Sequence, residues 1–195
     1  MQSLKSELFL ESTKGLVDSL TTLYTTWPEG LRQFRGTAER IARMYSEFCW
    51  SNEEIEEEVN RQLRVFDDRF DEMLVVKDLH LWTLCPHHLL PCELRVFVGY
   101  IPQEKRILGL SKFSRIAEVL AKRPILQERY TTELADLLME RLKPKGVGVT
   151  VYGTHGCMVA RGVKQHSEVV TAVMRGVFLK EGPTRAEFLA YCRDK

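Results

Sequence analysis

The stretch "MLVVKDLHLWTLCPHHLLPCELRVFVGYI", residues 73–101, decides the fold. Its first part is rich in β-formers, and "ELRVFVGYI" (93–101) places apolar residues at every second position. Such alternation is typical of a strand that packs one face against a core. The segment "LCPHHLLP" (84–91), which lies between these two runs, holds two prolines and predicts a turn. We therefore expect two antiparallel strands joined through a histidine-rich turn.

The sequence beyond this hairpin predicts two helices and two further strands. Helical spacing of apolar residues predicts one helix capped by Ser111 and another that runs from Pro124 to about Leu142. Valines alternate again over 147–151, and 168–178 has the composition of a fourth strand. This order predicts an α+β domain, an antiparallel four-stranded sheet with two helices on one face. The low charge of the strands suggests burial by neighbouring subunits.

Helical segments precede the predicted sheet. Apolar spacing predicts a helix over 12–24, a second capped by Thr37, and an acidic third within 51–66. We therefore expect a helical N-terminal arm, residues 1–70, followed by the α+β domain, residues 71–195.

Composition limits the class of protein. The chain has 28 basic and 27 acidic residues, so no overall field attracts nucleic acid or an anionic membrane. No apolar run approaches the ~20 residues of a spanning helix, and the N-terminus lacks the features of an export signal. An odd number of cysteines, five, argues against a disulfide framework. We expect a cytoplasmic protein with reduced thiols and with no nucleic-acid or membrane partner.

Two motifs contain potential metal ligands. Cys85 and His88 have the Cys-x-x-His spacing with which one turn can bind Zn²⁺. In "THGCM", His155 and Cys157 stand two apart on a predicted strand, so both would share a face. Cys85, His88 and Cys157 would leave a catalytic position open to water, with His87 and His155 as proton carriers. Adding His155 as a fourth ligand would instead close a structural site, and the motifs alone leave both sets open.

Cationic residues indicate a site for an anion. Lys112 and Arg115 lie in the first turn of the helix behind Ser111, where backbone N–H groups favour a phosphate. Arg161 and Lys164 add cations close in sequence to the metal candidates. The alternative is an ordinary capped helix with solvated charges.

Gln127 and Glu128 stand at the start of the second predicted helix. A carboxylate there can simply favour the helix dipole. It can also accept two hydrogen bonds from an edge such as that of guanine, which presents N–H and NH₂ side by side.

Together these motifs resemble the type I GTP cyclohydrolases. The likeness runs from about Thr37 to Phe188 and is most specific in "VKDLHLWTLCPHHLLP", "LGLSKFSRI", "QERYT" and "THGCMVARGV". The resemblance implies a zinc-dependent enzyme that hydrolyses GTP at guanine C8, releases formate and forms 7,8-dihydroneopterin triphosphate. It also implies a tunnelling fold and a homo-oligomer, typically a decamer with active sites at subunit interfaces.

The resemblance assigns roles to residues that match the family motifs. The implied zinc ligands are Cys85, His88 and Cys157. The implied proton-transfer and rearrangement residues are His87, His155 and Ser111. The implied GTP-binding residues are Gln127 and Glu128 for guanine, and Lys112, Arg115, Arg161 and a neighbouring subunit's Arg40 for the triphosphate.

The chain also departs from the family pattern. Pro86 replaces the usual Glu after the first ligand, and Gly156 stands where a larger side chain is common. Two alternatives follow from the same motifs. A nitrile reductase of the same fold would need a nucleophilic thiol, for which Cys92 is the nearby candidate, and a non-catalytic zinc or nucleotide-binding module would need His155 in the metal shell. A cyclohydrolase that stops at the ring-opened product is a further variant.

Overall fold

The computed structural model describes residues 2–104 and 106–193, which fall into two compact units, Met1–Trp50 and Ser51–Lys195. The first unit contains α1 (Gln2–Thr22), α2 (Pro28–Gln33) and α3 (Thr37–Phe48). Its helices are joined by a hydrogen bond from Thr13 Oγ1 to the carbonyl oxygen of Ala38, at 3.0 Å. The prediction that Thr37 caps α3 is wrong, because Gly36 occupies the N-cap with a left-handed φ of 74°.

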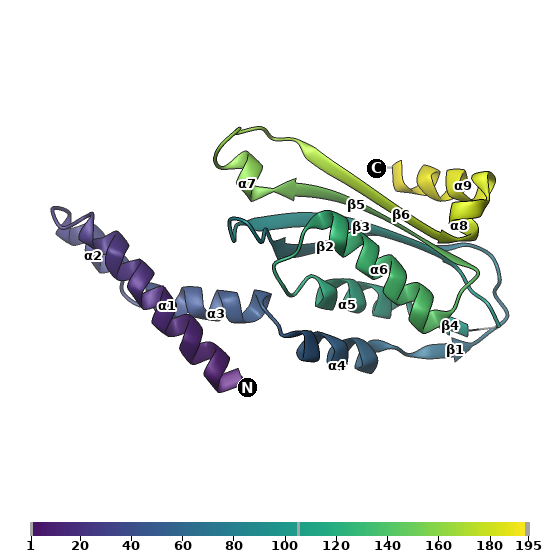
Figure 1. The fold of residues 1–195 in the computed structure, drawn as a ribbon, viewed down its shortest axis with the longest axis horizontal. Coiled ribbons are helices and arrows are strands. Elements are labelled where there is room, and N and C mark those ends of the chain that lie inside the picture. Colours follow the sequence, from purple (N-terminus) through teal and green to yellow (C-terminus); the bar gives the residue numbers. More distant parts are fainter. Residues whose placement is uncertain (1, 105, 194–195) are drawn as a thin grey trace. The chain divides into compact units, whose positions relative to one another are not determined.

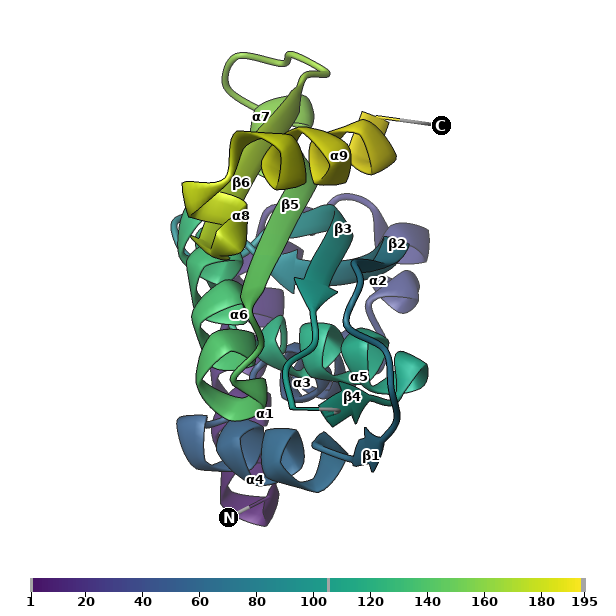
Figure 2. The ribbon, with the colours of Figure 1, turned by 90° about the vertical axis from the view of Figure 1, so that its right-hand side faces the viewer.

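The second unit carries the sheet (Figures 1 and 2). In chain order its elements are α4 (Asn52–Gln62), β1 (Val65–Asp67), β2 (Leu74–Leu84), β3 (Pro91–Ile101), β4 (Arg106–Leu108), α5 (Leu110–Leu120), α6 (Gln127–Leu142), β5 (Gly146–His155), α7 (Gly156–Val159), β6 (Glu168–Gly176), α8 (Val177–Lys180) and α9 (Gly182–Arg193). The predicted division at residue 70 stays a prediction, and α4 belongs to this second unit.

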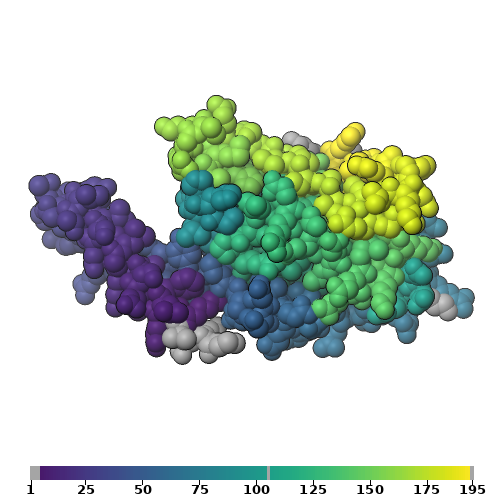
Figure 3. All heavy atoms as spheres, in the orientation of Figure 1, coloured from purple at the N-terminus to yellow at the C-terminus, as the bar shows by residue number. Residues whose placement is uncertain are grey.

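The main sheet has the order β2-β3-β5-β6, and every neighbouring pair is antiparallel. Alternate residues of the two central strands form one apolar face: Val96 pairs with Val151 and Val98 with Val149, all almost fully buried. Helices α5 and α6 cover this face (Figure 1), and in the space-filling view their atoms close over it (Figure 3). The predicted α+β class, with two helices on one face of a four-stranded antiparallel sheet, is confirmed.

The opposite face of the sheet is covered at one end by α8 and α9, which the sequence reasoning did not predict (Figure 2). Phe178 and Phe188 of these helices are completely buried against the strands. A Cβ atom on Gly99 would lie 2.5 Å from the Phe188 ring, and one on Gly148 would lie 2.8 Å from it. Glycines at these two positions therefore let the phenylalanine ring rest directly on the backbone of the sheet.

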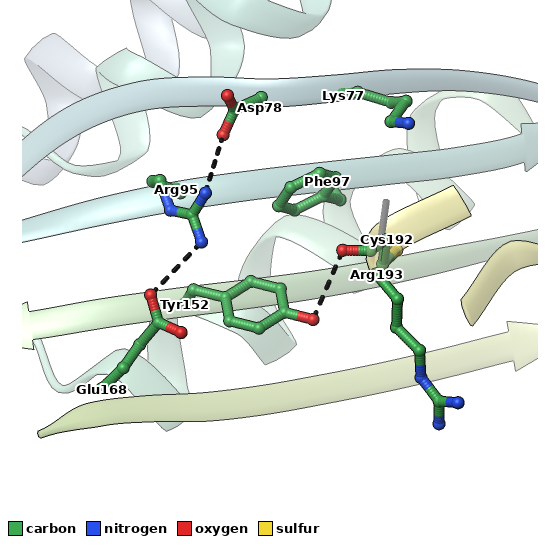
Figure 4. A pocket seen from close by; sticks show the side chains of 8 residues that line it. All are labelled: Lys77, Asp78, Arg95, Phe97, Tyr152, Glu168, Cys192 and Arg193. Atoms are coloured by element: carbon green, nitrogen blue, oxygen red, sulfur yellow. Dashed lines mark hydrogen bonds and ion pairs between the residues drawn. The ribbon is translucent and has the colours of Figure 1, made fainter. Parts of the chain in front are cut away.

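A pocket of about 610 Å³ lies beside α9 on this same face (Figure 4). A β-bulge between Val76 and Leu79, with Asp78 at a φ of 58°, allows Asp78 to pair with Arg95 at 3.5 Å. Arg95 also pairs with Glu168 at 3.2 Å and lies over the Tyr152 ring. The charges in this pocket thus largely neutralise one another and link strands β2, β3 and β6.

Two helix starts differ from the predictions. Helix α5 begins at Leu110 with Gly109 as its N-cap, so Ser111 lies in the first turn and makes no cap hydrogen bond. Helix α6 begins at Gln127 because Pro124 is held in an isolated bridge with Leu84. The short sheet of β1 and β4, also not predicted, fixes the approach to α5.

Strands β2 and β6 form the two edges of the main sheet. Each edge strand carries a large exposed side chain, Trp82 on β2 and Val170 on β6, about half exposed. Long edges with unpaired backbone groups are normally covered by another chain or element. None of the helices in the described part of the chain is long and apolar enough to cross a membrane.

Candidate metal centre and adjoining pocket

Three side chains that the motifs singled out meet at one end of the sheet. Cys85 follows β2, His88 lies in the β2–β3 turn, and Cys157 lies in α7. Their potential ligand atoms all lie within 4.8 Å of one another, and Cys85 Sγ is 3.8 Å from His88 Nδ1. Tetrahedral zinc with Zn–S and Zn–N bonds of about 2.3 and 2.0 Å places its ligand atoms about 3.5–3.8 Å apart. The donors therefore fit a zinc ion by type and by spacing.

Local backbone structure brings these donors together. The turn closes through hydrogen bonds from Cys85 N to Leu90 O at 2.9 Å and from Leu89 N to Cys85 O at 2.8 Å. Pro86 lies inside this turn, where the N–H it lacks is not needed to close it. A Cβ atom on Gly156 would lie 2.6 Å from the carbonyl oxygen of Pro91, so glycine lets α7 approach the turn.

The predicted reason for the proximity of His155 and Cys157 is wrong. Strand β5 ends at His155 and the chain then enters α7, so the two side chains do not share a strand face. Cys157 joins the metal group, whereas both ring nitrogens of His155 contact other residues. His155 Nε2 lies 2.8 Å from Gln127 Oε1, and His155 Nδ1 lies 3.3 Å from Cys92 Sγ.

His155 and His87 lie beside the metal group without joining it. Burial lowers the pKa of His155 below its ordinary value, and the nearby charge of Glu128 partly opposes this. His87 is exposed, and its ring centroid lies 6.3 Å from that of His88. The centre thus contains three grouped donors and two further imidazoles.

A pocket of about 180 Å³ adjoins the centre. The metal candidates Cys85 and Cys157 reach it, and so do Glu128 at the start of α6 and both neighbouring imidazoles. Its lining residues are Cys85, Pro86, His87, Ile125, Leu126, Gln127, Glu128, His155, Cys157, Met158 and Val169. The volume is below the roughly 300–1,000 Å³ of typical ligand sites. One chain thus provides room for only part of a nucleotide.

Gln127 is a buried residue that lines this pocket and is held in place by hydrogen bonds. Its amide nitrogen donates to the carbonyl oxygens of Val151 and Val169, at 3.0 and 2.9 Å, and contacts Thr171 Oγ1 at 3.2 Å. A Cβ atom on Gly153 would lie 2.0 Å from Gln127 Oε1, so glycine is required where α6 meets β5.

The predicted cations fall into three groups, each with different contacts. Arg161 follows α7, and its guanidinium contacts Nε2 of His88. Lys112 and Arg115 lie elsewhere, where both donate to Gln62 Oε1, at 3.0 and 3.4 Å. Arg40 belongs to the first unit, where it donates to Thr37 Oγ1 at 2.8 Å.

The start of α5 lies far from the metal group within one chain. Leu108, just before this helix, donates its N–H to the hydroxyl of Tyr100 on β3. Tyr100 is eight residues along β3 from Cys92, which contacts His155. At about 3.3 Å per residue the separation is about 26 Å. Ser111, Lys112 and Arg115 therefore do not line the pocket of their own chain.

Sequence reasoning missed Thr171, which contacts Gln127, and Gly153, which leaves space for the Gln127 amide. It also missed the thiol of Cys92 as the partner of His155. Cys92 and His155 stand opposite each other in the β3–β5 register. The signal that could have found this pair is strand register, which a single sequence leaves open.

Fold and site together define a class: an α+β domain in which a Cys/His/Cys group that could hold a metal ion adjoins a small pocket. The family model described as GTP cyclohydrolase I matches residues 26–193. The chain belongs to the GTP cyclohydrolase I family, and the resemblance of its motifs to that family is confirmed.

Two curated relatives agree with this membership. The chain is 46% identical over 161 residues to GTP cyclohydrolase 1 of Pelotomaculum thermopropionicum, covering 82% of each protein. It is 45% identical over 164 residues to GTP cyclohydrolase 1 of Aquifex aeolicus, covering 83% of each. The apo form of the archaeosine synthase QueF-Like aligns with a TM-score of 0.45 at 22% identity, over 53% of this chain and 93% of that one.

Proposed function

We propose that this protein hydrolyses GTP at C8 of guanine, releases formate and closes a new ring to give 7,8-dihydroneopterin triphosphate. The observation that carries this proposal is the arrangement of the site. Three donors, Cys85, His88 and Cys157, group together, and His155 stands beside them in the pocket but outside the group. Family membership over most of the chain supports the same reaction.

We propose zinc as the metal and these three side chains as its protein ligands. Zinc, when bound with one open position, supplies a water whose pKa is lowered to about 7. His155 directs one nitrogen to Gln127 and the other to Cys92. This engagement favours the open three-ligand site over the closed site in which His155 is a fourth ligand.

The imidazoles of the pocket are proposed to transfer protons. His155 is half-buried and its Nε2 lies on the pocket side with Gln127, which suits protonation of the guanine ring as C8 is attacked. His87 is exposed at the mouth and, with Ser111 of a second subunit, would assist the later rearrangement. The Glu128 carboxylate lines the same pocket and would accept the N–H and NH₂ of guanine, with Gln127 behind it.

We further propose a homo-oligomer, a decamer by family analogy, with active sites between subunits. Lys112 and Arg115 cannot reach their own pocket, so a neighbouring copy has to supply them to the triphosphate. Arg161 lies at the centre itself, and Arg40 would join from a neighbour. The edges of β2 and β6 offer backbone groups through which copies can pair.

The proposal includes a helical arm of residues 1–70 and a catalytic domain of 71–195, together with a cytoplasmic location. Reducing compartments keep thiols such as Cys85 and Cys157 available to a metal.

The nitrile-reductase alternative requires Cys92 as a nucleophile. Cys92 is only 1% exposed, and burial raises its pKa to about 11. The thiolate is the reactive form of cysteine, so this environment disfavours covalent attack.

The test uses the zinc-loaded, assembled protein with GTP, followed by oxidation and detection of pterin fluorescence and released formate. The proposal expects both products. Formate without pterin would identify an enzyme that stops at the ring-opened product, and neither product would refute the proposal.

A further inference from the structure

A buried thiol that the proposed reaction does not use touches the proposed proton carrier. Cys92 lies on β3 directly opposite His155 on β5 and is 1% exposed. Its Sγ lies 3.3 Å from His155 Nδ1, inside the distance for a sulfur hydrogen bond. Cys92 does not belong to the metal group formed by Cys85, His88 and Cys157.

The other side of the imidazole is fixed by Gln127. Carbonyl oxygens only accept hydrogen bonds, so the contacts to Val151 O and Val169 O require the amide nitrogen of Gln127 to face them. The amide oxygen therefore faces His155 Nε2 at 2.8 Å. Because this oxygen is an acceptor, Nε2 has to carry the proton.

This orientation determines the role of Cys92. A neutral imidazole with its proton on Nε2 has an acceptor at Nδ1, and the thiol is the donor within reach. We propose that Cys92 is a positioning residue that donates its S–H to Nδ1 and holds His155 in the Nε2–H tautomer.

The inference deepens the proposed function and rests on His155 as a proton carrier. With Nε2 protonated, this nitrogen donates to Gln127 Oε1, and both residues line the pocket. Nδ1 accepts the hydrogen bond from Cys92 on β3. Partners that orient metal-ligating histidines are commonly worth about 10–100-fold in metal affinity or activity, and we apply the same range to the partner of His155 beside the metal group.

Three variants separate positioning from packing. Cys92→Ala removes the donor, and Cys92→Ser keeps a hydroxyl donor at the same place. Cys192→Ala is the matched control, because Cys192 is also buried, at 5% exposure, but belongs to α9 and packs on the opposite face of the sheet. Each is compared with the parent by kcat, KM, zinc per chain and the midpoint of unfolding.

Cys92→Ala is expected to lower kcat about 10–100-fold with KM and zinc content unchanged. Cys92→Ser should recover most of this loss, and Cys192→Ala should retain kcat. Parental kcat in Cys92→Ala would overturn the inference. Loss of zinc would overturn it too, because it would make Cys92 part of the metal shell. An equal loss of kcat in Cys92→Ser would also overturn it, because the effect of Cys92 would then come from side-chain packing and not from a hydrogen bond.

A second readout does not depend on activity. Solid-state nitrogen-15 spectra of histidine-labelled, zinc-loaded protein report the tautomer of each ring, and His155→Gln identifies the signals of His155. We expect a protonated Nε2 and a bare Nδ1 in the parent, and a mixture of tautomers in Cys92→Ala. An unchanged single tautomer in Cys92→Ala would refute the inference even if the protein did not act on GTP.

Discussion

Gly153→Ala should disable the pocket through one added methyl group. The new Cβ atom would lie 2.0 Å from Gln127 Oε1 and 3.1 Å from His155 Nε2, whereas ordinary contacts begin near 3.4 Å. The amide would have to shift by about 1.4 Å, a displacement that its anchors at Val151 O and Val169 O oppose. Gln127 would lose its hydrogen bond to His155, and at least one of its hydrogen bonds to Val151 O and Val169 O would weaken.

Each lost hydrogen bond costs about 1 kcal/mol of interaction free energy, and buried groups left unpaired add to this cost. We therefore expect the pocket to lose about 2–3 kcal/mol of interaction free energy in total. If this loss raises the activation free energy of the reaction by the same amount, kcat falls about 30- to 150-fold. The assay is steady-state pterin fluorescence at saturating GTP, with zinc content measured on the same sample. Gly182→Ala is the control, because a Cβ atom there meets nothing within 4 Å. A Gly153→Ala enzyme with kcat within twofold of the parent would refute the reasoning.

The other predictions concern the metal ligands, the proton carrier His155, the binding of guanine and the assembly of subunits. Cys157→Ala should lose zinc and all activity, and a chelator should have the same effect on the parent protein. Added zinc should restore the chelated parent but not the variant, and metal analysis of both samples checks this. His155→Ala should keep its zinc but lose about 10²–10⁴-fold in kcat, the range for a general acid or base, and loss of the metal would instead favour the four-ligand site. Glu128→Ala should raise KM for GTP at unchanged zinc content, and an unchanged KM would remove Glu128 from the guanine site. Val170→Glu, on the exposed β6 edge, should shift the assembly to smaller species in light scattering, and an unchanged mass would argue against edge pairing.

The sheet was predictable because its residues obey local rules. Alternation around Val96 and Val98 reflects one face packed against helices, and it survives in the structure. Helix starts were less predictable, because a tertiary contact such as the Pro124 bridge to Leu84 delays α6. Helices α8 and α9 were missed, since Phe178 and Phe188 gain their burial from glycines on distant strands.

The site shows the same division. Motif spacing indicated Cys85, His88, His155 and Cys157 as candidates, and the family resemblance selected the three that the structure groups together, Cys85, His88 and Cys157. The argument for Cys157 assumed a strand that ends two residues earlier. The partnership depends on strand register that brings together Cys92 and His155, two residues 63 positions apart in the chain. A single sequence carries no direct signal for such a long-range pairing.

The measurement that tests the central claim most directly follows carbon C8 itself. GTP labelled with carbon-13 at C8 is incubated with the zinc-loaded, assembled protein, and both products are quantified by nuclear magnetic resonance. The account predicts labelled formate and unlabelled dihydroneopterin triphosphate in equal amounts. Label retained in the nucleotide, with no formate formed, would contradict it.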